Sequence, residues 1–430
     1  MGWGLNVGYA SVLTAVSPWL AWRAVRTGRY RDGWPERLLG RVPSLPAGRR
    51  SIWVHGVSLG EVQLLRPLIE RFHAEQAQHQ VVLSTSTLTG MQVARTTLPH
   101  VTSFYCPWDF TWAMQRAMQR LRPALIVLGE LELWPHLISI ANQQDIPIAI
   151  VNGRLSDRSL QGYRRFHALL GRTFKNLTLV AAQDDTTAER FRSLGVEADR
   201  VHATGSLKFD NVNADRNHVE VRRRADLVGL TQQHRVLVVG STQDPEELAA
   251  VTAVKQLLPK HPQLKLIVVP RHPERFDEVF RMLSQSNLSV LRRTAITHDR
   301  PADNDWQVLL VDTVGELKWW WGLAELALVG GSFGDRGGQN MLEPAAYGAK
   351  TAFGPNTQNF RAIVQALLEK EAVWELPTLD ALRGWIDDQL SRPEPGKART
   401  DRAIKWIGSH QGATERTYAL LNQLLETHAL

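Results

Sequence analysis

The sequence predicts an α/β protein with two Rossmann-like domains facing across a cleft. From residue 51 onward, short runs rich in β-branched residues alternate with longer amphipathic segments, as in βαβ units with a parallel sheet. The alternation stops at a polar, strongly charged stretch, 211–224, and then begins again. The chain has 430 residues, and a single hydrophobic core stops growing near ~250 to 300 residues. We therefore expect two cores joined by this stretch.

Ten segments are predicted to be strands, because each is a short apolar run followed by a polar or glycine-bearing turn and a helical pattern. In the first half they are 51–55, 80–84, 124–128, 147–151 and 177–181. In the second half they are 235–239, 264–269, 307–311, 326–329 and 350–353. A last helical pattern, 413–425, has no strand after it. We expect domains over 26–205 and 206–403, followed by a C-terminal helix, 404–430, that could cross back to the first domain.

The N-terminal segment 1–25 is expected to be a membrane anchor or an interfacial helix. No charged side chain occurs in the first 22 residues. Residues 3–22 have the ~20-residue length of a membrane span, but polar residues and a proline make an interfacial helix equally plausible. Four arginines follow between residues 23 and 31, which would keep the rest of the chain in the cytoplasm. The alternative is a helix docked on the protein's own surface.

Net charge and cysteine content narrow the partners and the chemistry. Fifty Lys and Arg against 43 Asp and Glu give a formal charge of +7, which favours anionic partners. Nucleic acid is the weakest candidate, because the chain has no basic arm, zinc finger or aromatic RNA-binding motif. Cys106 is the only cysteine, so neither an intrachain disulfide nor a cysteine-built metal site is possible. Without a clear base beside it, Cys106 is interpreted as a structural thiol in a reducing compartment.

Glu61 is interpreted as a general base. It lies where the strand 51–55 gives way to a helical pattern, and open α/β sheets keep their chemistry at the carboxyl ends of their strands. Ser58, the hydroxyl-rich run 84–87 and Glu130 follow strands at the corresponding edge. If Glu130 faces Glu61, its charge would make Glu61 a better base at neutral pH. The alternative for each polar loop, taken singly, is helix capping.

Loops of the second half predict a nucleotide site. Gly330 and Gly331 follow one strand, and glycine lets the backbone approach a ligand closely. A helix expected to begin near Asn340 would point free N–H groups at a phosphate. Glu343, one turn later, could accept hydrogen bonds from ribose hydroxyls. Taken alone, Asn340 and Glu343 would be interpreted as a capping box.

Three more loops are expected at the same edge. Arg271 follows the strand 264–269 and can bind a phosphate or carboxylate through two hydrogen bonds. The loops 240–242 and 314–316 follow two other strands. Four converging loops favour a nucleotide site over four separate structural turns. The lack of a Walker lysine motif and of a strand-borne G-x-G-x-x-G argues against an NTPase or a dehydrogenase.

Six ordered motifs resemble those of the 3-deoxy-D-manno-octulosonic acid (Kdo) transferases of lipopolysaccharide synthesis. They are 55–61, 130–135, 152–156, 205–210, 270–276 and 330–343. The resemblance implies a GT-B fold and an inverting, metal-independent transfer without a cofactor. It also implies CMP-Kdo as donor, bound by the second domain, and a tetraacyl lipid A precursor as acceptor, bound by the first. The implied location is the cytoplasmic face of the bacterial inner membrane.

The resemblance also implies roles for single residues. The glutamate that matches Glu61 is the family's proton acceptor, and the residues that match Glu130 and Lys208 stabilise the transition state. CMP contacts map onto Pro270, Arg271, Val314, Gly315, Glu316, Asn340, Met341, Leu342 and Glu343. No residue is implied as a metal ligand.

The chain departs from the family's usual pattern at a few positions. Gln243 and Gln339 stand where the family often has histidine. Glutamine can donate a hydrogen bond but cannot carry charge, so donor affinity or its pH dependence is expected to differ. Gly129 and Leu131, beside Glu130, are also unusual and bear on the shape of the acceptor site.

Two other functions stay open from the sequence. One is another GT-B activity, such as a UDP-sugar transferase or epimerase, which a preference for CMP over UDP would exclude. The other is a membrane-associated scaffold that retains an inactive transferase fold. The joint presence of Glu61, Lys208, Arg271 and Glu343 argues against a scaffold. The sequence leaves open the number of Kdo residues added and the acyl pattern of the acceptor.

Overall fold

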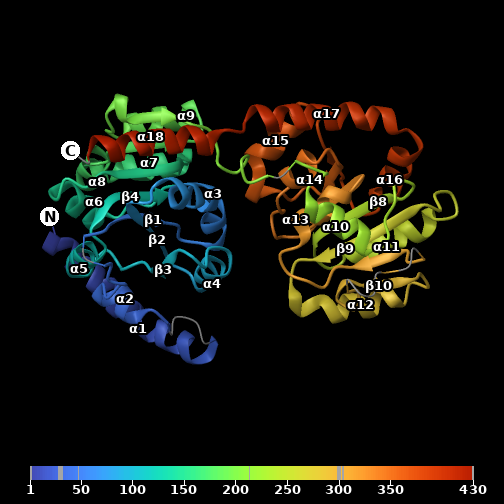
Figure 1. The fold of residues 1–430 in the computed structure, drawn as a ribbon, viewed down its shortest axis with the longest axis horizontal. Coiled ribbons are helices and arrows are strands. Elements are labelled where there is room, and N and C mark those ends of the chain that lie inside the picture. Colours follow the sequence, from blue (N-terminus) through green and yellow to red (C-terminus); the bar gives the residue numbers. More distant parts are fainter. Residues whose placement is uncertain are drawn as a thin grey trace. The chain divides into compact units, whose positions relative to one another are not determined.

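The computed structural model describes residues 2–27, 32–46, 48–212, 214–297, 302 and 305–428. The chain divides into two compact units (Figure 1). The first unit is Met1–Asn211 together with His410–Leu430, and the second is Val212–Ser409. The two units thus divide after Asn211 and after Ser409. From the sequence we expected the divisions after residues 205 and 403.

The first unit contains a seven-stranded parallel sheet with the order β3-β2-β1-β4-β5-β6-β7. Its strands are β1 (Arg50–His55), β2 (His79–Thr85), β3 (Thr102–Tyr105), β4 (Pro123–Gly129), β5 (Ile148–Gly153), β6 (Leu179–Ala182) and β7 (Val201–Ala203). Its helices are α1 (Gly2–Thr27), α2 (Trp34–Leu39), α3 (Leu59–Glu75), α4 (Leu88–Thr97), α5 (Thr111–Leu121), α6 (Pro135–Gln143), α7 (Asp157–Arg165), α8 (His167–Lys175), α9 (Asp185–Ser193) and α18 (Ala413–Thr427).

Helices cover both faces of this sheet. Buried side chains of α3, α4 and α18 pack on one face, and those of α5, α6, α8 and α9 pack on the other. Cys106 is buried, as expected for a structural thiol, and burial raises the pKa of its thiol to about 12.

The second unit contains a second seven-stranded parallel sheet, with the order β10-β11-β9-β8-β12-β13-β14. Its strands are β8 (Arg235–Thr242), β9 (Leu264–Pro270), β10 (Val290–Arg292), β11 (Val308–Leu310), β12 (Leu326–Val329), β13 (Lys350–Phe353) and β14 (Trp374–Glu375). Its helices are α10 (Val219–Leu227), α11 (Glu246–Leu257), α12 (Phe276–Ser284), α13 (Leu317–Trp320), α14 (Leu342–Ala346), α15 (Arg361–Glu369), α16 (Ala381–Ser391) and α17 (Pro393–Ser409). The end of the stretch 211–224, expected to be a connection, belongs to α10, which begins at Val219.

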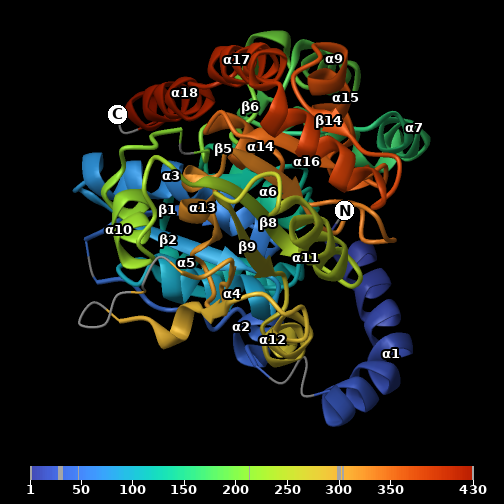
Figure 2. The same ribbon diagram turned by 90° about the vertical axis from the view of Figure 1, so that its right-hand side faces the viewer.

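Helix α1 is anchored to the first unit near its N-terminus. Asn6 donates to the hydroxyl of Thr111 (2.8 Å) and accepts from the Thr111 N–H (3.2 Å). The C-terminal part of α1 extends away from the body of the unit (Figure 2). None of the helices in the described part of the chain combines the length and the apolar character that crossing a membrane requires. Arg29 and Arg31, two of the four arginines after the apolar stretch, lie outside the described residues.

Candidate active site

The carboxyl ends of β1, β2, β4 and β5 form one edge of the first sheet. Strand β1 is central, and its last residue, His55, is in register with Ser84 of β2 and Leu128 of β4. The loops that carry Glu61 and Glu130 therefore leave the sheet side by side, as expected for neighbouring parallel strands.

Glu61 is held at the start of α3 by a capping arrangement. Its carboxylate accepts hydrogen bonds from the Val57 N–H (2.8 Å) and the Ser58 hydroxyl (2.9 Å). Ser58 in turn caps the helix by accepting from the Glu61 N–H (3.4 Å). Burial raises the pKa of Glu61, and the negative charge of Glu130 adds to this, against the opposing effect of the two hydrogen bonds.

Glu130 and Glu132 bring two further carboxylates to this edge. Glu130 follows β4 with a φ of 56° and donates its N–H to the Val151 carbonyl (2.9 Å). Such a left-handed conformation costs a non-glycine residue about 1 to 3 kcal/mol. Burial raises the pKa of Glu132 to about 7, and the charges of Glu61 and Glu130 contribute. We did not single out Glu132 from the sequence, although its place two residues after Glu130 was a usable signal.

Lys208 is positioned by a buried asparagine. Asn152 has a φ of 53°, and its side-chain oxygen accepts from the Leu207 N–H (3.0 Å) and the Ser206 hydroxyl (3.3 Å). Burial lowers the pKa of the Lys208 ammonium group, Glu130 opposes this effect and Arg154 adds to it. The first unit therefore brings Glu61, Glu130 and Lys208 within electrostatic reach of one another.

His55, at the carboxyl end of β1, is fully buried. Its Nδ1 lies 2.8 Å from the Ser84 hydroxyl, and burial lowers the pKa of the imidazole to about 4. His55 is thus neutral at physiological pH. The carboxylates are the better candidates for accepting a proton.

The structure shows what surrounds Gly129 and Leu131, the two unusual residues beside Glu130. A Cβ atom at Gly129 would lie 3.0 Å from a methyl group of Leu65 and 3.2 Å from the His55 carbonyl oxygen. Glycine thus avoids a tight contact at the end of β4. Leu131 lines a pocket together with Glu132.

In the second unit, a buried carboxylate joins two of the predicted nucleotide-binding loops. Glu246, at the start of α11, accepts hydrogen bonds from the N–H groups of Gln243 (2.9 Å), Gly331 (2.9 Å) and Ser332 (3.2 Å). A Cβ atom at Gly330 would lie 2.5 Å from this carboxylate, so only glycine fits there. The sequence reasoning missed Glu246, which is four residues beyond the loop 240–242.

A helix begins near Asn340, as predicted, but it is short. Helix α14 begins at Leu342 and has only five residues, so its dipole is too small for a helix-terminus phosphate site. Asn340 accepts from the Leu342 N–H (3.1 Å) and donates to Glu343 (3.1 Å). Backbone N–H groups of the glycine loop and nearby side chains are left as candidates for holding a phosphate.

The predicted CMP contacts differ in what they can offer. Arg271 is exposed. Burial raises the pKa of Glu343, and the charge of Arg271 opposes this effect in part. Val314 is 77% exposed, and Gly315 beside it has a φ of 85°. Four other predicted contacts are less available to a ligand.

Three of them are buried side chains, so they can contact a ligand mainly through their backbone: Pro270, Met341 and Leu342. The fourth is Glu316, whose carboxylate already accepts hydrogen bonds from Arg293 (3.1 and 3.2 Å). Among the predicted CMP contacts, the polar side chains that are at least partly exposed and not paired with an arginine are thus those of Arg271, Asn340 and Glu343.

Gln243 and Gln339, the two departures from the family pattern, lie beside the same glycine. Their side-chain nitrogens are 3.4 and 3.5 Å from the position that a Cβ atom would occupy at Gly331. Two neutral amide donors therefore meet at the loop where a phosphate is expected.

Comparisons with known proteins decide the family. A family model described as 3-deoxy-D-manno-octulosonic-acid transferase (kdotransferase) matches residues 32–211. The 3-deoxy-D-manno-octulosonic acid transferase of Haemophilus influenzae is 32% identical over 428 residues, which cover 97% of this chain and 98% of that protein. The chain belongs to the Kdo transferase family. The transferase of Bordetella pertussis is 31% identical over 97% of this chain and 99% of its own length.

Solved structures agree with the fold expected of a Kdo transferase. The UDP-GlcNAc 2-epimerase of Neisseria meningitidis has a TM-score of 0.55 at 11% identity, covering 87% of this chain and 100% of its own. A glycosyltransferase from Rickettsia africae has a TM-score of 0.55 at 10% identity, covering 88% and 99%. At such identities the likeness concerns the fold alone. The predicted GT-B architecture of two Rossmann-like units is confirmed, and family membership makes the chain a glycosyltransferase of lipopolysaccharide synthesis.

Proposed function

We propose that the protein transfers Kdo from CMP-Kdo to a lipid A precursor, with inversion and without a metal ion, and that Glu61 is the general base. The observation that carries this proposal is the grouping of Glu61, Glu130 and Lys208 at one edge of the first sheet. A carboxylate with a raised pKa is the stronger base that abstraction of a hydroxyl proton needs.

The reaction follows from these groups. The acceptor hydroxyl gives its proton to Glu61, and its oxygen attacks the anomeric carbon of Kdo. As that C–O bond forms, the bond from the anomeric carbon to the phosphate oxygen breaks, and its electron pair leaves with CMP. Glu130 and Lys208 are proposed to stabilise the charges that develop in this transition state.

The second unit is proposed to bind CMP. Arg271 would pair with the phosphate, and Gln243 and Gln339 would donate neutral hydrogen bonds beside Gly331. Glu343, steadied by Asn340, would accept from the ribose hydroxyls. The remaining predicted contacts would act through backbone groups or by shape.

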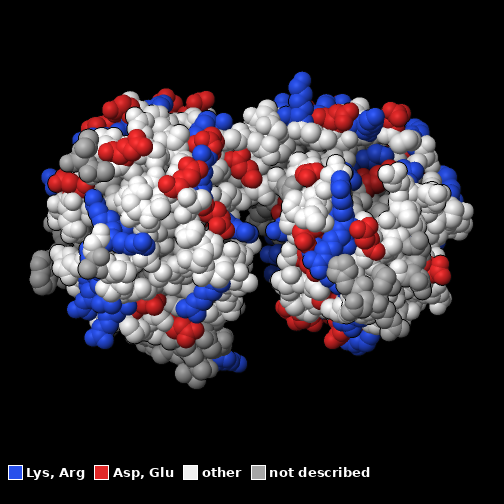
Figure 3. Space-filling view, in the orientation of Figure 1, with Lys and Arg blue, Asp and Glu red and all other residues white. Residues whose placement is uncertain are grey.

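Helix α1 is proposed to lie at the surface of the inner membrane, on its cytoplasmic face. Its exposed apolar side chains include Trp22, and an interfacial helix buries such a face among lipid headgroups. Figure 3 shows Lys and Arg side chains gathered around α5 of the first unit. Helix α5 contains Arg116 and Arg120 and no acidic residue, which suits an anionic lipid surface.

Incubation with CMP-Kdo and a tetraacylated lipid A precursor, followed by mass spectrometry, tests the proposed function. We expect a lipid product heavier by one or more Kdo residues, together with one CMP released for each Kdo added. Transfer from a UDP-sugar in place of CMP-Kdo, or CMP release without a lipid product, would refute the proposal.

A further inference from the structure

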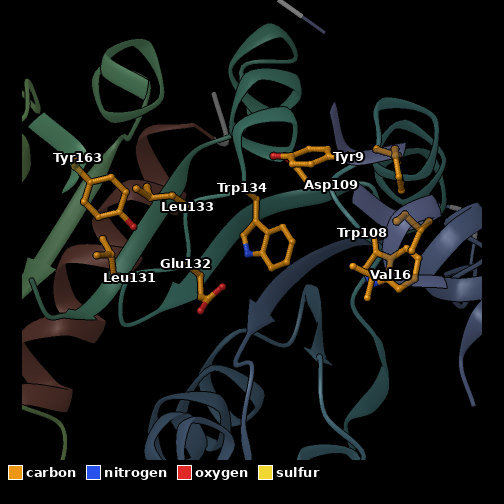
Figure 4. A pocket seen from close by; sticks show the side chains of 11 residues that line it. Tyr9, Val16, Trp108, Asp109, Leu131, Glu132, Leu133, Trp134 and Tyr163 are labelled. Atoms are coloured by element: carbon orange, nitrogen blue, oxygen red, sulfur yellow. The ribbon is translucent and has the colours of Figure 1, made fainter. Parts of the chain in front are cut away.

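A large pocket in the first unit has no part in the mechanism above. Its volume is about 640 Å³, within the range of roughly 300 to 1,000 Å³ that is typical of ligand sites. Its walls come from α1, the segments 108–110 and 131–134, and α7 (Figure 4). The lining residues are Tyr9, Leu13, Val16, Trp108, Asp109, Phe110, Leu131, Glu132, Leu133, Trp134 and Tyr163.

Most of this lining is apolar or aromatic, and its most deeply buried charged group is already satisfied. Asp109 is 4% exposed and accepts hydrogen bonds from the N–H groups of His136 and Leu137, both 2.9 Å long. It also accepts from the Tyr9 hydroxyl at 3.4 Å. A ligand would therefore be bound mainly through apolar contacts.

The polar end of the pocket coincides with the carboxylate cluster. Glu132 lines the pocket, and its pKa is raised in part by the charges of Glu61 and Glu130. The negative charge of Glu132 in turn raises the pKa of the Tyr163 hydroxyl, second to burial. A molecule in the pocket would thus have one end beside the proposed base.

The opposite wall is helix α1, and it is fixed in place. Asn6 and Tyr9 anchor α1 to the start of α5 and to Asp109. One turn and two turns further along the helix, Leu13 and Val16 face the pocket, and Val16 is 38% exposed. The pocket is therefore continuous with the helix that we propose to lie on the membrane.

An apolar pocket that begins at a membrane-surface helix and ends at a proton acceptor fits an amphiphile whose tail and reacting hydroxyl are in one molecule. We propose that this pocket binds one acyl chain of the lipid acceptor and so presents the acceptor hydroxyl to Glu61. This inference rests on the proposed function. It adds an acyl-binding subsite within the first unit.

Two matched substitutions on α1 test the subsite. Val16→Trp fills the pocket, whereas Val7→Trp places the same side chain at a position on the same helix that is 60% exposed and outside the lining. Neither valine is part of the core, so both variants are expected to fold. Each variant is compared with the wild type in Kdo transfer to a tetraacyl acceptor and to the same disaccharide without acyl chains.

We expect Val16→Trp to raise KM for the tetraacyl acceptor about tenfold, because several buried CH₂ groups would be displaced, and Val7→Trp to leave it unchanged. Neither variant should change KM for the deacylated acceptor or for CMP-Kdo. If the two variants behave alike with the tetraacyl acceptor, the subsite is wrong.

Direct binding of the tetraacyl lipid, measured without donor, separates the two proposals. Weaker binding of the lipid to Val16→Trp than to Val7→Trp supports the subsite, whether or not the wild type transfers Kdo. Absence of Kdo transfer by the wild type would refute the proposed function alone. Equal lipid binding by both variants, with Kdo transfer intact, would refute the subsite alone.

Discussion

Glu61 shows how one side chain serves both the local fold and the proposed chemistry. Its hydrogen bonds with Val57 and Ser58 make a helix cap, and capping was the alternative interpretation that the sequence left open. Two acidic neighbours distinguish it from an ordinary cap. The charge of Glu130 raises the pKa of Glu61, and the charge of Glu61 raises the pKa of Glu132. The cap fixes the carboxylate, and burial among like charges raises its basicity.

Glu132 should make the first unit less stable at high pH. Its pKa is about 7 in the folded protein against an ordinary 4.5. The unfolded chain therefore loses this proton first, so stability falls as the pH rises from 4.5 to about 7, and the penalty remains above pH 7. Glu132→Gln is expected to stabilise the first unit by roughly 1 kcal/mol at pH 8, after allowance for solvent screening.

Thermal unfolding of the variant and the wild type between pH 5 and pH 8 checks this expectation. The stabilisation should shrink as the pH falls. A stabilisation that is the same at every pH would show that ionisation of Glu132 is not its cause.

The two glutamines beside Gly331 should make donor binding less sensitive to pH than histidine would. In Gln339→His, the new imidazole would gain a proton near its ordinary pKa of about 6.5. Its charge would then attract the phosphate, so the ratio of variant to wild-type CMP affinity should rise severalfold from pH 7.5 to pH 5.5. Calorimetric titration with CMP measures this ratio, and a ratio that stays constant would place the phosphate away from Gln339.

At the scale of elements, the sequence predicted the centres of both sheets and missed their edges. All ten predicted strands are present, within a few residues at each end. The four that were missed are β3, β7, β10 and β14, which are the outermost strands of the two sheets. They have two to four residues each and are only partly buried. Such strands lack the continuous apolar run by which central parallel strands are recognised.

The loops of the candidate site were predictable in position but not in detail. Strand ends placed Glu61, Glu130, Arg271 and Glu343 at the edges of their sheets, because parallel strands end together. The length of α14 was not predictable. The helical pattern after Asn340 continues past Ala346, where the helix ends, and the left-handed conformation of Gly348, with a φ of 73°, follows. Hydrogen bonds that join distant loops, such as those of Glu246, also leave no local pattern.

Glu246 and Glu247 offer a test of how the second unit positions its donor loops. Glu246 holds the two loops together through three N–H groups, whereas Glu247 pairs with Arg275 (2.6 Å) and touches neither loop through a hydrogen bond in the described structure. Both are buried. Glu246→Gln should lower stability by about 1 to 3 kcal/mol and also weaken CMP binding.

Glu247→Gln is the matched control and should lower stability while leaving CMP affinity unchanged. Thermal unfolding and CMP titration of both variants give the comparison. Equal losses of CMP affinity would mean that Glu246 supports the fold in general and has no special role in the loops.

At the scale of the whole molecule, the chain returns to its first unit at the end. Helix α18 packs on the first sheet beside α3, whose Phe72 contacts Tyr418 at 5.1 Å between ring centroids. Asp210 accepts from the Gly412 N–H at 2.7 Å. The helical pattern at 413–425 predicted the helix, but such a pattern does not identify the surface against which its apolar face packs.

Leu421 of α18 should therefore stabilise the first unit although it lies near the C-terminus. It is fully buried, so Leu421→Ala should destabilise the first unit by about 2 to 5 kcal/mol. The exposed Gln423 provides the control Gln423→Ala, which should have little effect. In calorimetric scans, the unfolding transition whose temperature rises with CMP belongs to the second unit. If Leu421→Ala shifted only that transition, the domain division would be contradicted.

The most direct test of the account is Kdo transfer by Glu61→Gln, measured together with CMP affinity. Glutamine keeps an oxygen for the Val57 N–H, so the cap of α3 should survive. We predict that the transfer rate falls by about 10² to 10⁴-fold while CMP affinity stays at the wild-type value. Transfer at the wild-type rate, or a loss of CMP binding that accounts for the lower rate, would contradict the role of Glu61 as the base.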